Sequence, residues 1–361
     1  MILLTMGLPG RFAAWGDAVA ARLAGHAASE VTYATGPSVT DLFGYEAMPS
    51  TLGEIARVLI AQRGRHVVFG ARQPDGRLCD MLAAGGTRFV IVLDDPRSAA
   101  ADLLTETGAD AKLVVRAIAN CCPAMLRCRA LPGALVITAE RAAADPAGSV
   151  AAIAEHFAIA VGPREIGAIA RQLARPGPGR KGREASLQPH PPAVRKMIDG
   201  ALLGYHHQFS EGRLQEITWT RDLFLTPDAG QTPNQPISLA GGSRAVVYGP
   251  YIQLPAGSWA AEAVFGFSPE AVGTTIQVDV FAGAQLACAT VQPEAPGIYS
   301  AGLNFSLGEP GEKGVEIRFL VGRDNAAGQL ALGHVVLRPS AMRHAGDAGL
   351  QESDFTRVLA I

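Results

Sequence analysis

The stretch Met1–Gly25, MILLTMGLPGRFAAWGDAVAARLAG, decides the fold of the first half of the chain. A short apolar run meets a Gly-Leu-Pro-Gly turn, and an Ala-rich segment with apolar residues at helical spacing follows, which predicts a buried strand, a tight turn and a helix. Such a turn favours an anion, because its N–H groups and the positive end of the helix dipole face the space above the strand. A phosphate loop normally adds Lys, Ser or Thr, whereas residues 10–15 here read GRFAAW.

The alternation of short apolar runs with helical segments continues to about residue 173. Predicted strands cover residues 2–6, 31–35, 66–70, 88–93 and 134–138, and predicted helices cover 11–24, 51–63, 97–107, 109–129 and 146–158. This alternation predicts an α/β domain in which helices cover both faces of a parallel sheet. A loop rich in Pro and Gly follows at 175–190, and a further helix is predicted over Pro192–Tyr205, so the first domain is placed at 1–205.

Period-two alternation with frequent Gly and Pro turns begins near residue 218. The strand-like segments are 248–251, 258–267, 275–281, 285–291, 298–307, 315–321 and 329–338. Their spacing predicts an all-β second domain over 218–340, an antiparallel β-sandwich that is most simply a jelly roll. Residues 341–361 form a polar tail that ends in a short apolar segment.

The composition and net charge limit the classes of molecule that the protein is expected to bind. The 361 residues carry a formal net charge of -2, so nothing in the charge balance calls for nucleic acid or an anionic membrane. No stretch approaches the roughly 20 apolar residues of a membrane span, and no basic leader precedes the first strand, so we expect a soluble, cytoplasmic protein. The cysteines are odd in number, and we expect reduced thiols in a cytosolic core at Cys79, Cys121, Cys122, Cys128 and Cys288.

Three places in the first domain resemble the sulfotransferase family, in the family's order. Pro9 and Trp15 keep the ends of its Pro-Lys-Ser-Gly-Thr-Thr-Trp loop, and residues 89–98, FVIVLDDPRS, resemble its strand ending in Arg-x-Pro-Arg/Lys. Residues 180–182 match its late Arg-Lys-Gly loop. The resemblance implies a P-loop-type sheet and a site for the donor 3'-phosphoadenosine-5'-phosphosulfate (PAPS), with cofactor contacts from Pro9, Gly10, Arg11, Arg180, Lys181 and Gly182.

The departures from the family fall on the residues that hold the donor. Residues 10–14 lack the family's Lys and hydroxyl groups and offer only Arg11, while Asp94 and Asp102 replace the Arg and Ser that bind the 3'-phosphate. Like charges about 4 Å apart repel by roughly 4 kcal/mol at an effective dielectric near 20, which lowers affinity about a thousandfold. We therefore expect donor binding to be lost or drastically weakened and no cofactor to be bound, with PAPS as the cofactor if the site functions.

Each motif also has a structural interpretation. Pro9 and Trp15 would then be a helix start and a core aromatic, and an Asp before Pro96 would cap the next helix. The basic triplet at 180–182 would be a solvated linker.

Other candidate chemistry is sparse. His66 begins a predicted strand, His156 lies on a helix that packs on the sheet, and both are interpreted as core or surface histidines rather than bases. The adjacent His206 and His207 point apart on a helix and make a poor metal pair. No metal-ligand motif is present, so no metal site is expected.

Residues 244–259, RAVVYGPYIQLPAGSW, are the most distinctive stretch of the second domain. They resemble the start of β-sandwich modules attached to bacterial glycosyltransferases and surface-polysaccharide proteins, which implies a glycan or a protein as partner. Sugar sites stack rings on aromatics and pair hydroxyls with polar side chains. The candidates are Arg244, Tyr248, Tyr251, Trp259, Glu316 and Arg318. In the structural alternative, Trp259 fills the core and Glu316 pairs with Arg318 on one face of a strand.

Two functions follow from these resemblances. The first is a degenerate sulfotransferase-like protein that acts as a binding or scaffold component in bacterial cell-surface polysaccharide production, with the sandwich holding glycan or a partner protein. The alternative is an active sulfotransferase that moves a sulfuryl group from PAPS to a glycan or small-molecule hydroxyl. We favour the first, because sulfuryl transfer depends on preorganised positive charge and the expected cationic cradle is missing.

Overall fold

The computed structural model describes residues 2–27, 32–36, 54, 67–173, 187–227, 233–308, 313–322, 327–340 and 358–360. The chain divides into two compact units, Met1–Pro191 and Pro192–Ile361. The boundary lies at Pro192, whereas the sequence analysis placed residues up to 205 in the first domain. The helix that begins at Pro192 therefore belongs to the second unit.

The first unit is built on a parallel sheet of five strands. Its order is β2-β3-β1-β4-β5, and every described pairing is parallel. The strands are β1 Ile2–Gly7, β2 Thr32–Gly36, β3 Val67–Ala71, β4 Phe89–Leu93 and β5 Ala134–Thr138. Each strand lies within two residues of its predicted limits, so the parallel α/β sheet expected from the alternation of apolar runs is confirmed.

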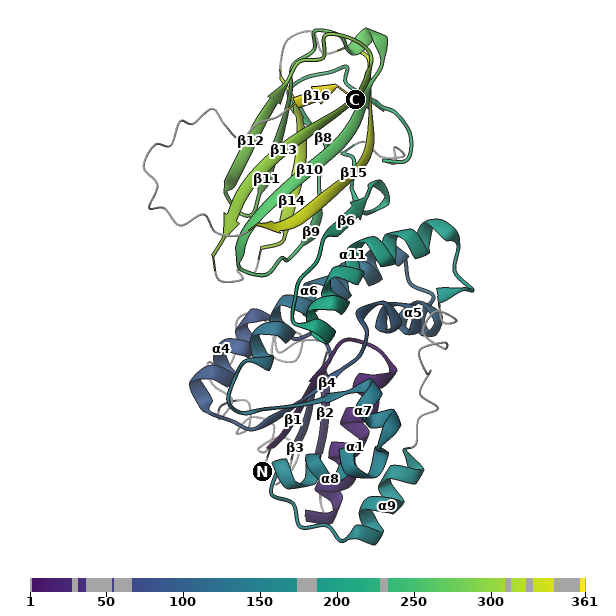
Figure 1. Ribbon diagram of the computed structural model, residues 1–361, viewed down its shortest axis with the longest axis vertical. Coiled ribbons are helices and arrows are strands. Elements are labelled where there is room, and N and C mark those ends of the chain that lie inside the picture. Colours follow the sequence, from purple (N-terminus) through teal and green to yellow (C-terminus); the bar gives the residue numbers. More distant parts are fainter. Residues whose placement is uncertain are drawn as a thin grey trace. The chain divides into compact units, whose positions relative to one another are not determined.

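Helices flank this sheet in two groups (Figure 1). One group comprises α1 Arg11–Ala27, α7 Ala139–Ala144, α8 Pro146–His156 and α9 Pro163–Gln172. The other comprises α4 Gly76–Gly85, α5 Pro96–Thr107 and α6 Ala111–Arg129. Between α1, α8 and the sheet lies a cluster of buried apolar side chains that includes Leu23, Val90, Val92 and Ile153. Among the described residues, no helix has both the length and the apolar character needed to cross a bilayer.

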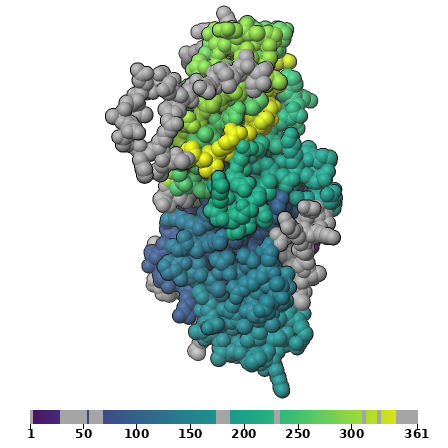
Figure 2. Space-filling view, viewed as in Figure 1, coloured from purple at the N-terminus to yellow at the C-terminus, as the bar shows by residue number. Residues whose placement is uncertain are grey.

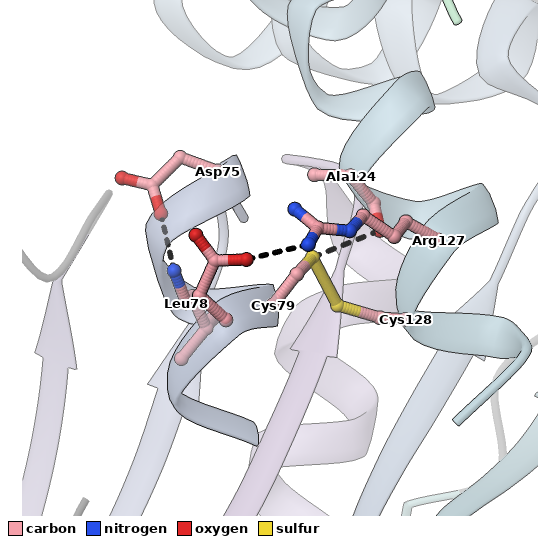
Figure 3. The surroundings of a disulfide bond; sticks show 7 residues. Asp75, Leu78, Cys79, Ala124, Arg127 and Cys128 are labelled. Atoms are coloured by element: carbon pink, nitrogen blue, oxygen red, sulfur yellow. Dashed lines mark hydrogen bonds and ion pairs between the residues drawn. A yellow bond between two sulfur atoms is a disulfide. The ribbon is translucent and has the colours of Figure 1, made fainter. Parts of the chain in front are cut away.

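A disulfide joins the second group of helices. Cys79 of α4 bonds to Cys128 of α6, 49 residues later (Figure 3). The ion pair between Arg127 and Asp80, with 2.5 Å between Nη2 and Oδ1, links the same two helices. The prediction of reduced thiols is thus wrong for this pair. It failed because residues distant in the sequence come together only when the helices pack, which cysteine spacing alone does not reveal.

The second unit is a sandwich of two antiparallel sheets with one helix, α11 Pro192–Glu211. One sheet has the order β16-β13-β10-β15-β6, with β7 paired to β15, and the other has the order β12-β11-β14-β8, with β9 paired to β14. The strands are β6 Ile217–Thr220, β7 Ile237–Ser238, β8 Arg244–Val247, β9 Pro250–Ile252, β10 Gly257–Phe267, β11 Ile276–Phe281, β12 Gln285–Val291, β13 Gly297–Leu307, β14 Val315–Val321, β15 Gln329–Ser340 and β16 Val358–Ala360. The predicted antiparallel sandwich is confirmed.

The core of the sandwich lies between the sheets. Phe265 of β10 meets Phe319 of β14 edge to face, with ring centroids 5.2 Å apart, and Trp219 is fully buried. In the space-filling view of the whole chain, β15 of this unit forms a yellow band (Figure 2). The helix α11 is attached by its packing on β6 and by a hydrogen bond from the Tyr205 hydroxyl to the Gln253 carbonyl, 3.1 Å away.

Candidate functional site

The first candidate site is the carboxyl edge of the parallel sheet, where the β1–α1 and β4–α5 connections leave neighbouring strands. Open α/β sheets bind ligands at this edge, at the point where the strand order reverses. Here Gly10, with φ 151°, lies against α5, and a Cβ atom added to it would be 3.5 Å from the Ala99 Cα. The first connection therefore packs on the helix that follows β4.

Arg11, the cation of the first connection, is bound by two carboxylates of α5. Its Nε lies 2.8 Å from a Glu106 oxygen and 3.9 Å from an Asp102 oxygen. The hydrogen bond to Glu106 and the charge of Asp102 raise the pKa of Arg11. An incoming phosphate at Arg11 would have to displace both carboxylates, so Asp102 and Glu106 oppose an anion at this position.

The other landmarks of the predicted loop have packing roles. Pro9 is buried, and Trp15 stacks on Phe12 with centroids 5.1 Å apart while packing against the apolar core. A Cβ atom added to Gly16 would be 2.7 Å from Val92 of β4, so this glycine lets α1 approach the sheet. The structural interpretation of Trp15 as a core aromatic fits this arrangement.

Asp95 caps the next helix. Its carboxylate accepts a hydrogen bond from the Arg97 backbone N–H at 3.0 Å and forms an ion pair with the Arg97 guanidinium at 2.8 Å. Asp94 accepts a hydrogen bond from the Asp95 backbone N–H at 2.9 Å. Helix capping, one of the two alternatives for this acidic pair, accounts for Asp95.

Sequence reasoning also missed a further arginine–carboxylate pair in this unit. Asp17 of α1 is buried, accepts a hydrogen bond from the Thr5 hydroxyl at 2.6 Å and pairs with Arg72, just beyond β3, at 3.2 Å. The sequence signal that could have revealed this pair was Asp17 itself, a charged residue at a helix position that faces the core. Arg11, Arg72 and Arg97 therefore all pair with carboxylates, which offsets the positive charge that a phosphate would use.

Among the remaining candidates of the first unit, only His156 lies within the described residues. Arg180, Lys181, Gly182 and His66 lie outside the described residues. The His156 Nε2 atom lies 3.1 Å from two backbone carbonyl oxygens, which is a structural role. In the described part of the chain, His, Cys, Asp and Glu side chains form no group of three that could hold a metal.

Two of the six sandwich candidates have structural roles. Trp259 is 2% exposed and donates its indole N–H to the Pro255 carbonyl at 3.1 Å, so its ring has no open face for a sugar. The Arg244 guanidinium donates to the carbonyls of Ala240 and Ser238 at 2.8 and 3.1 Å, and so holds the turn before β8. Trp259 thus leaves the candidate set as a core residue, the alternative weighed from the sequence.

The other candidates gather on the outward face of the sheet formed by β12, β11, β14 and β8. The side chains of Val278 and Val280 on β11 and of Ile317 and Phe319 on β14 point inward and are buried. The side chains between them point outward. These outward residues, Gln277, Asp279 and Phe281 on β11 and Glu316, Arg318 and Leu320 on β14, form what we call the outer strip.

One end of the outer strip is aromatic. We define the aromatic end as Tyr248, Tyr251, Phe281 and Glu316. Tyr251 is 39% exposed, has a left-handed backbone with φ 64°, and meets Tyr248 edge to face at 6.2 Å. A hydrogen bond links Tyr251 to Glu316, and burial raises the pKa of Glu316 more than this bond and Arg318 lower it.

Arg318 forms a closed ion pair in the middle of the strip. Its Nε and Nη2 atoms donate to the two oxygens of Asp279 at 2.9 and 2.6 Å, and its guanidinium carbon lies 3.9 Å from the Phe281 ring centroid. Asp279 is fully buried beneath this contact. The sequence alternative paired Arg318 with Glu316, but Asp279, its cross-strand neighbour, is the partner. The register between β11 and β14 determines which carboxylate pairs with Arg318, and a single sequence does not supply that register.

The other end of the strip is a hollow of about 400 Å³. Its lining is polar and apolar in similar measure and comes from four strands and the turns beside them: Ser243, Arg244, Ala245, Thr275, Gln277, Thr290, Leu320, Val321 and Gly322. Sequence reasoning missed all of these residues except Arg244, because they meet only through strand pairing.

No protein-family model matches this chain, and no curated protein sequence does either. Among solved structures, sulfotransferases are similar to the N-terminal half and carbohydrate-binding modules to the C-terminal part. A mouse sulfotransferase in complex with PAP is 13% identical, with 48% of this chain and 62% of that chain covered and a TM-score of 0.36. The chain therefore spans less than two thirds of that protein. A sulfotransferase from Alicyclobacillus acidocaldarius is 13% identical over 53% of this chain and 98% of its own, with a TM-score of 0.31. The C-terminal CBM6 of LamC from Zobellia galactanivorans is 17% identical over 34% of this chain and 98% of its own, with a TM-score of 0.22.

Proposed function

We propose that the second unit binds glycan at the aromatic end of the outer strip. In this proposal the first unit is a sulfotransferase-like scaffold whose donor site is degenerate, and the protein serves bacterial cell-surface polysaccharide production. The sandwich holds the glycan, and a partner protein is the competing occupant.

The observation that carries this proposal is the conformation of Tyr251. A bulky side chain in the left-handed region costs about 1–2 kcal/mol, and such strain concentrates at ligand sites. Here it accompanies an aromatic ring that is 39% exposed and hydrogen-bonded to the Glu316 carboxylate. An exposed ring next to a fixed acceptor provides both a stacking face and a partner for sugar hydroxyls.

The proposed loss of donor binding rests on charge. Asp102 and Glu106 contact Arg11, while Asp95 and Asp17 pair with the arginines near the neighbouring strand ends. A dianionic phosphate could bind these arginines only after their ion pairs with the carboxylates had been separated, which costs free energy. Electrostatic preorganisation for sulfuryl transfer needs cations already aimed at the ligand.

Glycan binding is tested with the full-length protein on an oligosaccharide library of neutral hexoses and hexuronates, from mono- to hexasaccharides. We expect binding that Tyr251→Ala weakens about tenfold, the loss of one stacking contact. Ile298→Ala is the matched control, because Ile298 is 53% exposed on the other sheet. A flat response of the wild-type protein to the whole library would reject glycan and leave a protein partner.

The transferase alternative is tested by calorimetric titration with adenosine 3',5'-bisphosphate. We expect no heat of binding up to millimolar nucleotide. Micromolar binding that is abolished by Arg11→Ala would overturn the proposed degeneracy and make PAPS the cofactor.

The cytoplasmic location stays a prediction from the sequence. The disulfide between Cys79 and Cys128 weighs against it, because disulfides are rare in the reducing cytosol. Alkylation of free thiols in intact cells, followed by mass spectrometry, would show whether Cys79 and Cys128 are reduced, as expected in the cytoplasm, or joined in the disulfide.

A further inference from the structure

The aromatic end and the hollow belong to one continuous surface. The pairing of β11 with β14 runs without a register shift from Ile276 opposite Val321 to Phe281 opposite Glu316. Gln277, which lines the hollow, and Phe281, at the aromatic end, are four residues apart on one face of β11, about 13 Å. A single sugar ring is too short to touch both.

The lining of the hollow suits a polyol. Ser243, Thr275 and Thr290 bring hydroxyl groups, and Gln277 brings an amide, so donors and acceptors are both present. The Arg244 guanidinium is fixed there by the carbonyls of Ala240 and Ser238. Among the described lining residues there is no carboxylate, so the hollow accepts a neutral or acidic sugar and has no carboxylate to attract a cation.

We propose that the hollow is a second sugar subsite, so that the ligand is an oligosaccharide that lies along β11 and β14 from Tyr251 to Gln277. This inference rests on the proposed glycan binding and adds the length of the bound glycan and the direction in which it lies. A chain that occupied both ends would cross the ion pair of Asp279 with Arg318, in which each charge is already paired with the other.

Cys288 provides a reporter at the middle of this path. It lies opposite Asp279 in the pairing of β11 with β12, and its Sγ accepts a hydrogen bond from the Gln277 amide at 2.7 Å. The other cysteines are shielded from alkylation. Cys79 and Cys128 form the disulfide, while Cys121 and Cys122 are buried, which raises the pKa of Cys121 to about 12.

The first experiment measures affinity against chain length with the same library of mono- to hexasaccharides. We expect Thr290→Val to weaken hexasaccharide binding about tenfold, the loss of one hydrogen bond to a fixed partner, and to leave monosaccharide binding unchanged. Tyr251→Ala should weaken both. Asn304→Ala, at an exposed position on the other sheet, is the control and should change neither.

The second experiment follows alkylation of Cys288 by iodoacetamide in the full-length protein. A hexasaccharide should slow the reaction at least tenfold, and a monosaccharide at the same fractional saturation should not. Equal effects of Thr290→Val on short and long ligands, or no protection of Cys288 by a bound hexasaccharide, would overturn the second subsite while leaving glycan binding at Tyr251 intact. No binding by any library member would instead reject the proposed function itself, and with it this extension.

Discussion

Removing the disulfide should destabilise the first unit by a predictable amount. Cys79 and Cys128 close a loop with a sequence separation of 49 residues. The loop-closure model assigns such a cross-link about 4 kcal/mol at 25 °C, and measured values are commonly 2–4 kcal/mol because unfolded chains keep some structure. With a urea dependence of about 2 kcal/mol per molar, typical of a small unit, the unfolding midpoint should fall by about 1–2 M.

The assay compares the wild-type protein with the variant C79S/C128S in urea, monitored by far-ultraviolet circular dichroism, with and without reductant. Reductant should lower the wild-type midpoint and leave the variant unchanged. Cys288→Ser is the matched control, since Cys288 lies in the other unit and is free. If the non-reduced protein alkylates at all five cysteines after unfolding, or if reductant leaves the wild-type midpoint in place, the reasoning is refuted.

Three further predictions concern packing and charge. Asp279→Ala should cost about 3 kcal/mol of stability in urea, because the Arg318 side chain, 23% exposed, would lose its bidentate partner; a loss below about 1 kcal/mol would mean that water replaces the carboxylate. Burial raises the pKa of Glu316, so the folded state holds this proton more tightly, and its contribution to stability is lost as the pH rises from 4.5 through the raised pKa. In thermal melts recorded at a series of pH values, Glu316→Gln should remove this decrease of stability with rising pH. If the melting temperatures of the wild type and the variant change with pH at the same slope, the prediction is wrong. Gly16→Ala should cost about 1–3 kcal/mol by overpacking Val92, and additive losses in a double-mutant cycle with Val92→Ala would exclude this contact.

The agreement between sequence and structure is best where local patterns carry the information. In the first unit, apolar runs bounded by turn residues located every strand of the parallel sheet, because a strand buried on both faces must be apolar throughout. In the second unit, the predicted limits of residues 285–291 and 315–321 coincide with β12 and β14. Period-two alternation places strands well when one face of each strand is buried.

The candidate sites were only partly accessible from the sequence. The replacement of the family's Arg and Ser by Asp94 and Asp102 was visible in the sequence as a change of charge, and its effect on donor binding stays a prediction. The ion pair that Asp102 and Glu106 of α5 form with Arg11 of α1 was not visible, because the contact depends on how the two helices pack. The sequence left two interpretations of Trp259 open, because an aromatic residue at a strand start is consistent with either an exposed stacking surface or a buried core position; the structure places it in the core.

What the sequence determined by itself is therefore the order and type of the elements, the change of fold class near residue 218, and the loss of the phosphate-binding residues after Pro9. Only the tertiary structure decided which charges meet, which cysteines bond and which side chains line the hollow. The physical reason is the distance along the chain over which each effect acts. Periodicity and turn chemistry act over a few residues, whereas the pairs Arg318–Asp279 and Cys79–Cys128 depend on strand register and helix packing between positions tens of residues apart.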